Sequence, residues 1–487
     1  MKKLTYLKSL FQRFKLSGLL ILITIIPYLN SFTCSFQLDD YHTIQINKQI
    51  GNIERFFDFS IWSSIFYNRQ LSNLTFTINY LIDGFSVFGY HAFNLLIHLL
   101  NVLLVFNLVN NLFETPSLKN IEFYKDKKFI AFFTAVIFAV HPIQVQAVTY
   151  ITQRMVSLSI FFYLSGMLIY IKTRLQSGQK LNAVKYLLLF ICFVFGIYSK
   201  EIIFSLPIAI IFIELLFFKN SEGKLNLKFI LSIVAFLICA SAIIMIKNGF
   251  PQQAEAPTPY HYFLTQLTVL VIYIRLLFIP LNQHLYYLVA VKNNLFDAAV
   301  LSSTIFIIII IAIGIYFYKK NKLISFAIGM FFISQIIESS IFPFKYLLFE
   351  YRLYLSTISV GLLISTVLLT YFKKKYAITA LSVIAFIYCI LTFNQNSIWQ
   401  NPIKLWTNNV EKSPKNPVAN NNLGSEYMMV NDFENAFKFF NKAIELDSNY
   451  ADPYSQRAVI FSNNKNYSAA IKDAFKAIKL NTKIALF

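Results

Sequence analysis

Residues 298–318 read AAVLSSTIFIIIIIAIGIYFY, an apolar run without a charged residue. A helix needs about 20 such residues to cross the hydrocarbon core of a bilayer. Similar runs recur over most of the first 395 residues, and the 487-residue chain is 57% hydrophobic but only 14% charged. A soluble protein of this size would need more polar surface. The sequence therefore predicts an all-α fold, a polytopic bundle of membrane helices.

The apolar runs predict about eleven membrane spans. They lie near residues 17–32, 90–113, 129–143, 151–171, 184–199, 202–218, 229–246, 298–318, 323–342, 353–372 and 376–392. A further apolar stretch, 263–280, is predicted to be re-entrant or interfacial, because a span there would place Lys319, Lys320 and Lys322 on the outer side of the membrane. A full span is the competing interpretation.

The formal net charge of +20 is concentrated in short loops between these spans. Residues 1–15, 114–128, 172–185, 219–228, 319–322 and 373–375 together hold 22 Lys or Arg residues and four acids. Short loops rich in Lys and Arg face the cytoplasm. The pattern therefore predicts a cytoplasmic N-terminus and an extracytoplasmic segment 33–89, and it explains the charge without a nucleic-acid partner.

After residue 395 the composition becomes polar and a period of 34 residues appears. At this offset small residues match at Gly424 and Ala458, and aromatic residues match at Tyr427 and Phe461. This pattern is typical of tetratricopeptide (TPR) helix pairs. The predicted domains are a membrane domain, 1–395, and an extracytoplasmic TPR domain, 396–487, with a half repeat at 401–415 and full repeats at 416–449 and 450–483. So few repeats are expected to need support from the membrane domain or a partner.

Ionisable side chains gather at the predicted outer ends of the spans. Asp39 and Asp40 follow the first span directly, where burial and mutual repulsion could raise one pKa and provide a general base. A solvated acidic loop is the alternative. The other members of this outer group are His141, Arg154, Lys200, Glu201, Glu350 and Arg352. Transfer of a group from a lipid phosphate requires a general base and several cations on one face of the membrane.

A second polar group lies within the predicted span 90–113. His91, Asn94, His98 and Asn101 fall on one face of a helix, so that face is expected to contact protein or a wet cavity. The two histidines are about 10 Å apart along the helix, too far to share a metal ion. Hydrogen bonding between helices is the alternative to a substrate-binding role. The four cysteines have no paired spacing, so neither a disulfide framework nor a metal site is expected.

Several motifs together resemble a known family. They include FQLDDYHTI at 36–44, YHAFNLLIHLLNVLLV at 90–105, HPIQVQAVTYITQR at 141–154, YSKE at 198–201 and FEYRLYLS at 349–356, followed by the TPR repeats. In this order they resemble the transmembrane and TPR-containing O-mannosyltransferases and their bacterial relatives. The resemblance implies a GT-C fold, an extracytoplasmic active site and a dolichyl- or polyprenyl-phosphate sugar as donor.

The resemblance also implies roles for individual residues. Asp39 corresponds to the base, with Asp40 beside it, and Arg352 lies at a position suited to the donor phosphate. The further candidates for donor or substrate binding are Glu350, Lys200, Glu201, His141, Arg154, His91 and His98. Two positions differ from the family pattern. Gln146 stands where an acid is usual, and the usual Arg-Pro-Leu reads Arg69, Gln70 and Leu71.

The sequence thus predicts a membrane glycosyltransferase that moves mannose or another hexose from a polyprenyl-phosphate donor to a Ser or Thr hydroxyl of a polypeptide. Arginine and lysine can balance the phosphate charge, so no metal or other cofactor is required. Its expected partners are membrane lipid, the lipid-phosphate sugar, and an acceptor polypeptide or partner protein at the TPR domain. A bacterial inner membrane is expected, or the endoplasmic reticulum in a eukaryote. The alternative is a non-enzymatic TPR scaffold, or a transport or assembly protein for cell-envelope polymers.

Overall fold

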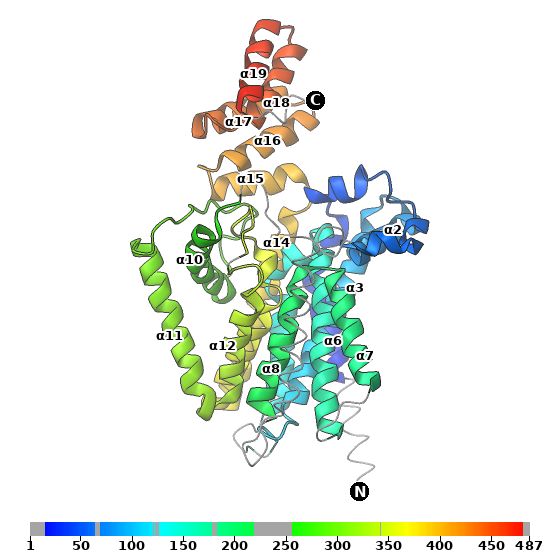
Figure 1. The fold of residues 1–487 in the computed structure, drawn as a ribbon, viewed down its shortest axis with the longest axis vertical. Coiled ribbons are helices and arrows are strands. Elements are labelled where there is room, and N and C mark those ends of the chain that lie inside the picture. Colours follow the sequence, from blue (N-terminus) through cyan, green and yellow to red (C-terminus); the bar gives the residue numbers. More distant parts are fainter. Residues whose placement is uncertain are drawn as a thin grey trace. The chain divides into compact units, whose positions relative to one another are not determined.

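The computed structural model describes residues 15–63, 69–119, 121, 126–177, 183–218, 256–340 and 342–480. These residues form helices and connecting loops and no strand, which confirms the all-α prediction (Figure 1). The predicted span 229–246 lies outside the described residues. The chain divides into two compact units, which we call the membrane unit (1–281 and 291–396) and the TPR unit (282–290 and 397–487).

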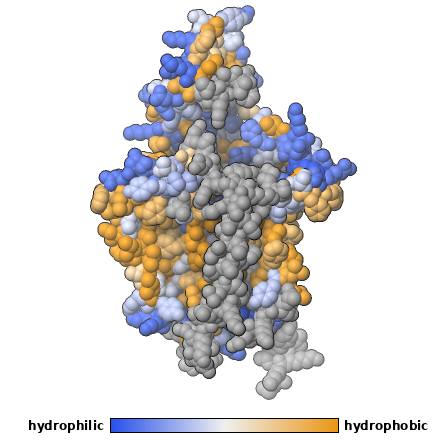
Figure 2. All heavy atoms as spheres, in the orientation of Figure 1, coloured by the Kyte–Doolittle hydropathy of each residue, from blue (hydrophilic) through white to orange (hydrophobic). Residues whose placement is uncertain are grey.

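Each predicted span that falls within the described residues coincides with a helix. The first helix is Lys15–Tyr28. It is followed by α3 (Val87–Leu112), α4 (Lys127–Val140), α6 (Arg154–Ser177), α7 (Ala183–Ile197), α8 (Leu206–Phe217), α11 (Ala298–Lys320), α12 (Lys322–Gln335), α13 (Ser356–Tyr371) and α14 (Lys374–Ile398). On the face drawn in Figure 2, apolar residues form a belt over the helices of the membrane unit, and hydrophilic residues gather at the helix ends.

Five helices in the described residues are long and apolar enough to cross a bilayer: Val87–Leu112, Ile151–Gln176, Pro259–Phe278, Ala298–Lys320 and Lys374–Ile398. A sixth arises if α4 and the segment Pro142–Val148, which bends from it by 51°, count as one span. Four further apolar helices are shorter. The chain is therefore a multi-pass membrane protein, but the count of about eleven spans is not confirmed.

Residues 263–280, the predicted re-entrant or interfacial segment, are helical. They lie almost entirely in α10 (Pro259–Phe278), one continuous helix of 20 residues. Its N-terminus is well defined, because Pro259 occupies the first turn and the Thr258 side chain accepts a hydrogen bond from the backbone N–H of His261. α10 is long and apolar enough to cross the membrane, so an interfacial segment and a full span both stay predictions.

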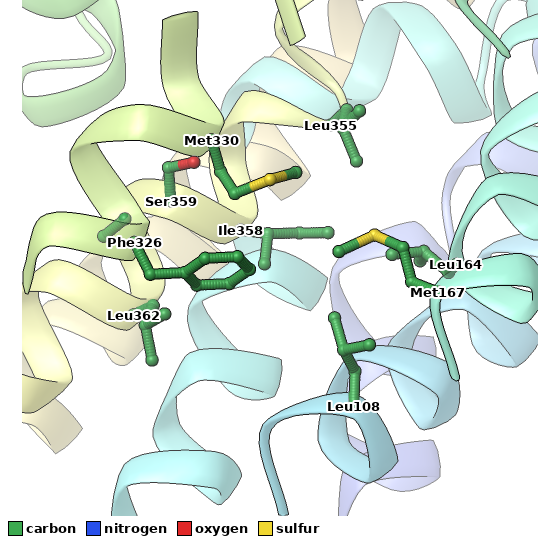
Figure 3. Close-up of a pocket in the computed structure, with 10 residues that line it drawn as sticks. Leu108, Leu164, Met167, Phe326, Met330, Leu355, Ile358, Ser359 and Leu362 are labelled. Carbon is green, nitrogen blue, oxygen red and sulfur yellow. The ribbon is translucent and has the colours of Figure 1, made fainter. Parts of the chain in front are cut away.

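The membrane unit is closely packed between its helices. At the contact of α13 with α4, a Cβ atom on Gly361 would lie 2.9 Å from the carbonyl oxygen of Thr134. A cavity of about 10 Å³ lies between α3, α6, α12 and α13. Leu108, Met167 and Met330 point toward one another there (Figure 3). This volume holds about one water molecule, so the cavity is a packing gap and not a substrate site.

The close approach at Gly361 gives a test of the packing. Gly361→Ala should lower the unfolding free energy of the full chain in detergent by about 1–3 kcal/mol, because the added methyl meets a backbone carbonyl that cannot move aside. Gly18→Ala is the matched control, since nothing lies within 4 Å of a Cβ there. Thermal unfolding measures both, and equal midpoints would contradict this packing.

The part of the TPR unit that the structure describes contains five helices in chain order. They are α15 (Pro402–Lys412), α16 (Pro417–Met429), α17 (Phe433–Leu446), α18 (Asp452–Asn463) and α19 (Tyr467–Leu480). The side chains of Asn401, Asn416 and Asp432 cap the first three by accepting backbone N–H groups. Gly424 is required where α16 meets α17, because a Cβ there would lie 2.7 Å from the Phe440 ring.

A segment from between α10 and α11 packs into the TPR unit. This strap, residues 282–290, is held by Asn409, whose Oδ1 accepts the backbone N–H groups of Leu285 and Tyr286, each at 2.9 Å. Lys412 also donates to the Gln283 carbonyl at 2.6 Å. The short array thus gains support from residues that precede it by more than a hundred positions, as the small number of repeats requires.

Candidate active site

The acidic pair after the first helix consists of one buried and one exposed residue. Asp40 is 1% exposed. Its Oδ2 accepts the backbone N–H of Gln37 at 2.9 Å, and its Oδ1 accepts that of Thr152 at 2.8 Å. Burial raises the pKa of Asp40 to about 7, although these two hydrogen bonds oppose the rise. Asp40 therefore ties the loop after the first helix to the segment that precedes α6.

Asp39 is the exposed member of the pair. Its backbone N–H donates to the Tyr150 hydroxyl at 2.9 Å. Within the described residues, no hydrogen bond or ion pair engages its carboxylate. The preceding residue, Leu38, has a φ of 49°, in the left-handed region that leucine rarely adopts. Backbone strain of this kind is concentrated at functional sites, and here it presents Asp39 to the outside.

A cluster of charged side chains forms where four segments of the membrane unit end. Arg69, just before α2 (Gln70–Asp83), pairs with Glu201 at 3.4 Å. Glu338, which follows α12, lies 3.5 Å from Nζ of Lys200 and 3.9 Å from Nε of Arg352. Lys200 and Glu201 join α7 to α8, and Arg352 lies in the short helix Glu350–Leu353. The structure thus brings together Lys200, Glu201 and Arg352, three of the candidate residues, and their roles stay predictions.

The cluster has a buried layer and an accessible one. The side chains of Lys200, Glu338 and Arg352 are each 3% exposed, whereas those of Arg69 and Glu201 are 35% and 16% exposed. Arg352 also donates to two backbone carbonyls, of Tyr346 at 2.9 Å and Leu347 at 3.3 Å. Glu350 is buried in the same short helix. Arg69 is therefore the accessible cation of the group.

Electrostatics connect Arg69 to the exposed acid. Burial alone would lower the pKa of the Arg69 guanidinium, but Glu201, Tyr351, Glu338 and Asp39 together raise it above its ordinary value. Arg69 has a φ of 37°, so it too lies in the left-handed region. Lys200 lies behind it, with its ammonium 4.0 Å above the Tyr351 ring, and burial lowers the pKa of that ammonium. Asp39 is exposed, and Arg69 has the most exposed side chain of the charged cluster.

Arg154 lies apart from this cluster. It is fully buried, and its Nε donates to Asn94 Oδ1 at 2.6 Å and its Nη2 to the Tyr90 carbonyl at 3.0 Å. Its remaining nitrogen, Nη1, donates to the Thr75 hydroxyl at 3.2 Å, and the guanidinium lies 4.6 Å from the Phe76 ring centre. Arg154 therefore joins α2, α3 and α6, and its predicted contact with the donor phosphate stays a prediction.

The three histidines make hydrogen bonds between segments. His91 Nε2 lies 2.9 Å from the Cys34 carbonyl, and His141 Nε2 lies 2.9 Å from the Leu277 carbonyl. His98 lies between the Ala139 carbonyl, 3.1 Å away, and the Tyr354 hydroxyl, 2.7 Å away. These contacts correspond to the alternative of interhelical hydrogen bonding. Across the described ranges, no group of three or more His, Cys, Asp or Glu side chains is arranged to hold a metal ion.

Comparisons with known proteins agree with the motifs. A tetratricopeptide repeat family model matches residues 418–450. A Caenorhabditis elegans protein O-mannosyl-transferase is 26% identical over 461 residues, which cover 89% of this chain and 63% of that protein. Protein O-mannosyl-transferases of Drosophila melanogaster and Mus musculus are 31% and 30% identical over 35% and 33% of this chain, and over 20% and 17% of their own lengths. The chain is a relative of the TPR-containing protein O-mannosyl-transferases.

The predicted family resemblance is thereby confirmed. The chain spans less than two thirds of the length of these O-mannosyl-transferases. No solved structure matches it.

Two cluster residues of this O-mannosyl-transferase relative were missed in the sequence. Glu338 falls inside the predicted span 323–342, where a lone acid is itself a signal of function. The helix ends at Gln335, so Glu338 in fact lies beyond it. Of the family's Arg-Pro-Leu this chain retains Arg69 and Leu71, and the retained arginine was the available signal.

The division between the two acids can be tested by stability. Asp40→Asn should lower the unfolding free energy by about 1–3 kcal/mol, because an amide nitrogen would face a backbone N–H and leave it unpaired. Asp39→Asn, at an exposed position, should leave the unfolding midpoint unchanged. Thermal unfolding of the detergent-purified full chain measures both variants. A larger loss for Asp39→Asn would reverse the assignment.

Proposed function

We propose that this protein transfers mannose from a polyprenyl- or dolichyl-phosphate donor to a Ser or Thr hydroxyl of a polypeptide, on the extracytoplasmic face of a GT-C-type membrane unit. The observation that carries the proposal is the exposed Asp39 carboxylate, whose charge acts on Arg69, together with a cluster that holds three cations, Arg69, Lys200 and Arg352. The relatives named protein O-mannosyl-transferases support the reaction class. The loop charges support the side of the membrane.

Arg69 is best placed to meet the donor phosphate. It is the accessible cation, and its planar guanidinium can bind two phosphate oxygens at once. Lys200 and Arg352 lie deeper and are fixed by Glu338, so they add positive potential without having to move. The predicted role of Arg352 thus becomes that of a fixed charge behind Arg69.

A large apolar groove in the membrane unit suits the lipid part of such a donor. It measures about 940 Å³ and is lined from α10, α11, α12, α13 and α14, almost entirely by aliphatic and aromatic side chains. Its lining residue Ile274 follows Tyr273, whose hydroxyl lies 3.1 Å from the carbonyl oxygen of Phe349. Phe349 directly precedes the short helix that holds Arg352. A lipid chain in the groove could therefore place its phosphate near the charged cluster.

The chemistry is a single displacement at the anomeric carbon. Asp39 accepts the proton of the acceptor hydroxyl, and the hydroxyl oxygen forms a new bond to the anomeric carbon. The bond from that carbon to the phosphate oxygen breaks, and its electron pair leaves with the polyprenyl phosphate. Arg69, backed by Lys200 and Arg352, stabilises the departing charge. The three cations supply the charge balance, so the scheme requires neither a metal ion nor another cofactor.

The TPR unit would recruit the acceptor. TPR arrays bind polypeptides on the concave surface formed by their helices. The charge of the loops supports a position for this unit on the same side of the membrane as Asp39. Acceptor recognition and transfer would then occur in one compartment.

The test of the proposed base is Asp39→Asn. This change keeps the size of the side chain but removes its basicity, so transfer should fall by about 10²- to 10⁴-fold. Glu54→Gln, an exposed acid of the same outer loop, is the matched control and should retain activity. Mannose incorporation into acceptor protein is measured at equal membrane abundance. Full transfer by Asp39→Asn would leave the scaffold or assembly function as the better explanation.

The groove assignment is tested with neighbouring residues of α11. Ile310 lines the groove, whereas Ile309 is half exposed and lies outside the lining. Ile310→Trp should raise KM for a long-chain polyprenyl-phosphate mannose severalfold, because the indole occupies space needed by the chain, and should affect a donor with one or two isoprene units little. Ile309→Trp should change neither value. The same KM for the long-chain donor in both variants would remove the groove from the donor site.

A further inference from the structure

The last TPR helix exposes a row of large apolar side chains. On α19, Tyr467 is 61% exposed, Ile471 56%, Phe475 68% and Ile478 38%. Their spacing places them along one stripe of the helix. The opposite side of the helix, with Asp473 and Ala477, is buried. A large apolar stripe exposed on a helix, such as this α19 stripe, is typical of a surface that another element covers.

In the first repeat, the corresponding face belongs to α17 and packs against another helix. At the offset of 34, Phe437 on α17 corresponds to Ile471, and Asn441 corresponds to Phe475. The Phe437 ring lies 5.5 Å from that of Phe461 on α18, and Asn441 Oδ1 accepts a hydrogen bond from Arg457, also on α18. The corresponding face of α17 therefore packs against the next helix of the array. The α19 stripe presents the same face with nothing on it among the described residues.

A helix that covers the α19 stripe must carry different side chains from those of α18. Where α17 has the polar Asn441, α19 has the more apolar Phe475, so an arginine like Arg457 would have no acceptor there. Lys472, Lys476 and Lys479 are exposed along one edge of the stripe. A helix that covers the stripe must therefore carry an apolar face and an acidic edge. A second copy of α19 would bring two rows of lysines together, which is unfavourable.

We propose that the α19 stripe binds an amphipathic helix of a partner polypeptide, which crosses α19 as α18 crosses α17 and faces the three lysines with acidic side chains. This surface is separate from the charged cluster and does not depend on the transfer reaction. It gives the protein a second polypeptide-binding surface, distinct in chemistry from any site for a Ser or Thr acceptor.

The test uses the full chain in detergent and two stapled helical peptides of 12 residues, the length of α18. Both peptides have leucines on one face, and one carries glutamates along the edge while the other carries lysines. The acidic peptide should bind, and the basic peptide should bind at least about tenfold more weakly, because like charges would meet at the three lysines. Equal binding of the two peptides, or binding of neither, would overturn the proposal.

Variants locate the bound peptide. Phe475→Asp should abolish binding of the acidic peptide, and Val459→Asp, a half-exposed apolar position on α18, is the matched control that should not. Unchanged binding by Phe475→Asp would overturn the proposal. So would a dimer of the full chain that Phe475→Asp dissociates, since a second copy would then be the occupant. A chain ending at Leu480 should bind like the full chain, and binding seen only after this truncation would mean that residues 481–487 cover the stripe.

Discussion

The buried ion pairs of Glu338 hold the candidate site together. A single carboxylate that is 3% exposed lies within 4 Å of both Lys200 and Arg352. A charge removed from water is costly unless it is paired, and removing one partner of such a group typically costs several kcal/mol. The link between α7 and α8, the end of α12 and the short helix at Glu350–Leu353 must therefore keep one arrangement. The side chains of Arg69 and Glu201 are more exposed than those of this buried layer.

The acidic pair also depends on a buried carboxylate, that of Asp40. Asp40 accepts two backbone N–H groups from segments far apart in the chain and fixes the loop that carries Asp39. Because Asp40 fixes the loop, the Asp39 side chain can remain exposed. The strained φ angles of Leu38 and Arg69, on either side of the site, indicate that the surrounding contacts impose these conformations. Rigid support behind an accessible acid and an accessible arginine is the arrangement that transfer chemistry favours.

The TPR unit depends on a different constraint, the small number of its repeats. Asn409 receives two backbone N–H groups of the strap, and Lys412 binds a strap carbonyl. These contacts stabilise the near end of the array. At the other end, the α19 stripe stays uncovered within the described residues. One end of the array is thus supported from within the chain, and the other offers a surface for a partner.

The sequence by itself determined the helical membrane class, the TPR array and the family resemblance, because hydropathy, a 34-residue period and linear motifs are local properties of the chain. It also indicated Asp39, Lys200, Glu201 and Arg352, since charged residues beside apolar runs stand out. It could not show that Asp40 is buried against Thr152, that Arg154 is used between α2 and α3, or that Glu338 lies beyond its helix. Those facts depend on contacts between residues 50 to 150 positions apart, and the pairing of distant charges is decided by helix packing, which leaves no periodic trace in the sequence.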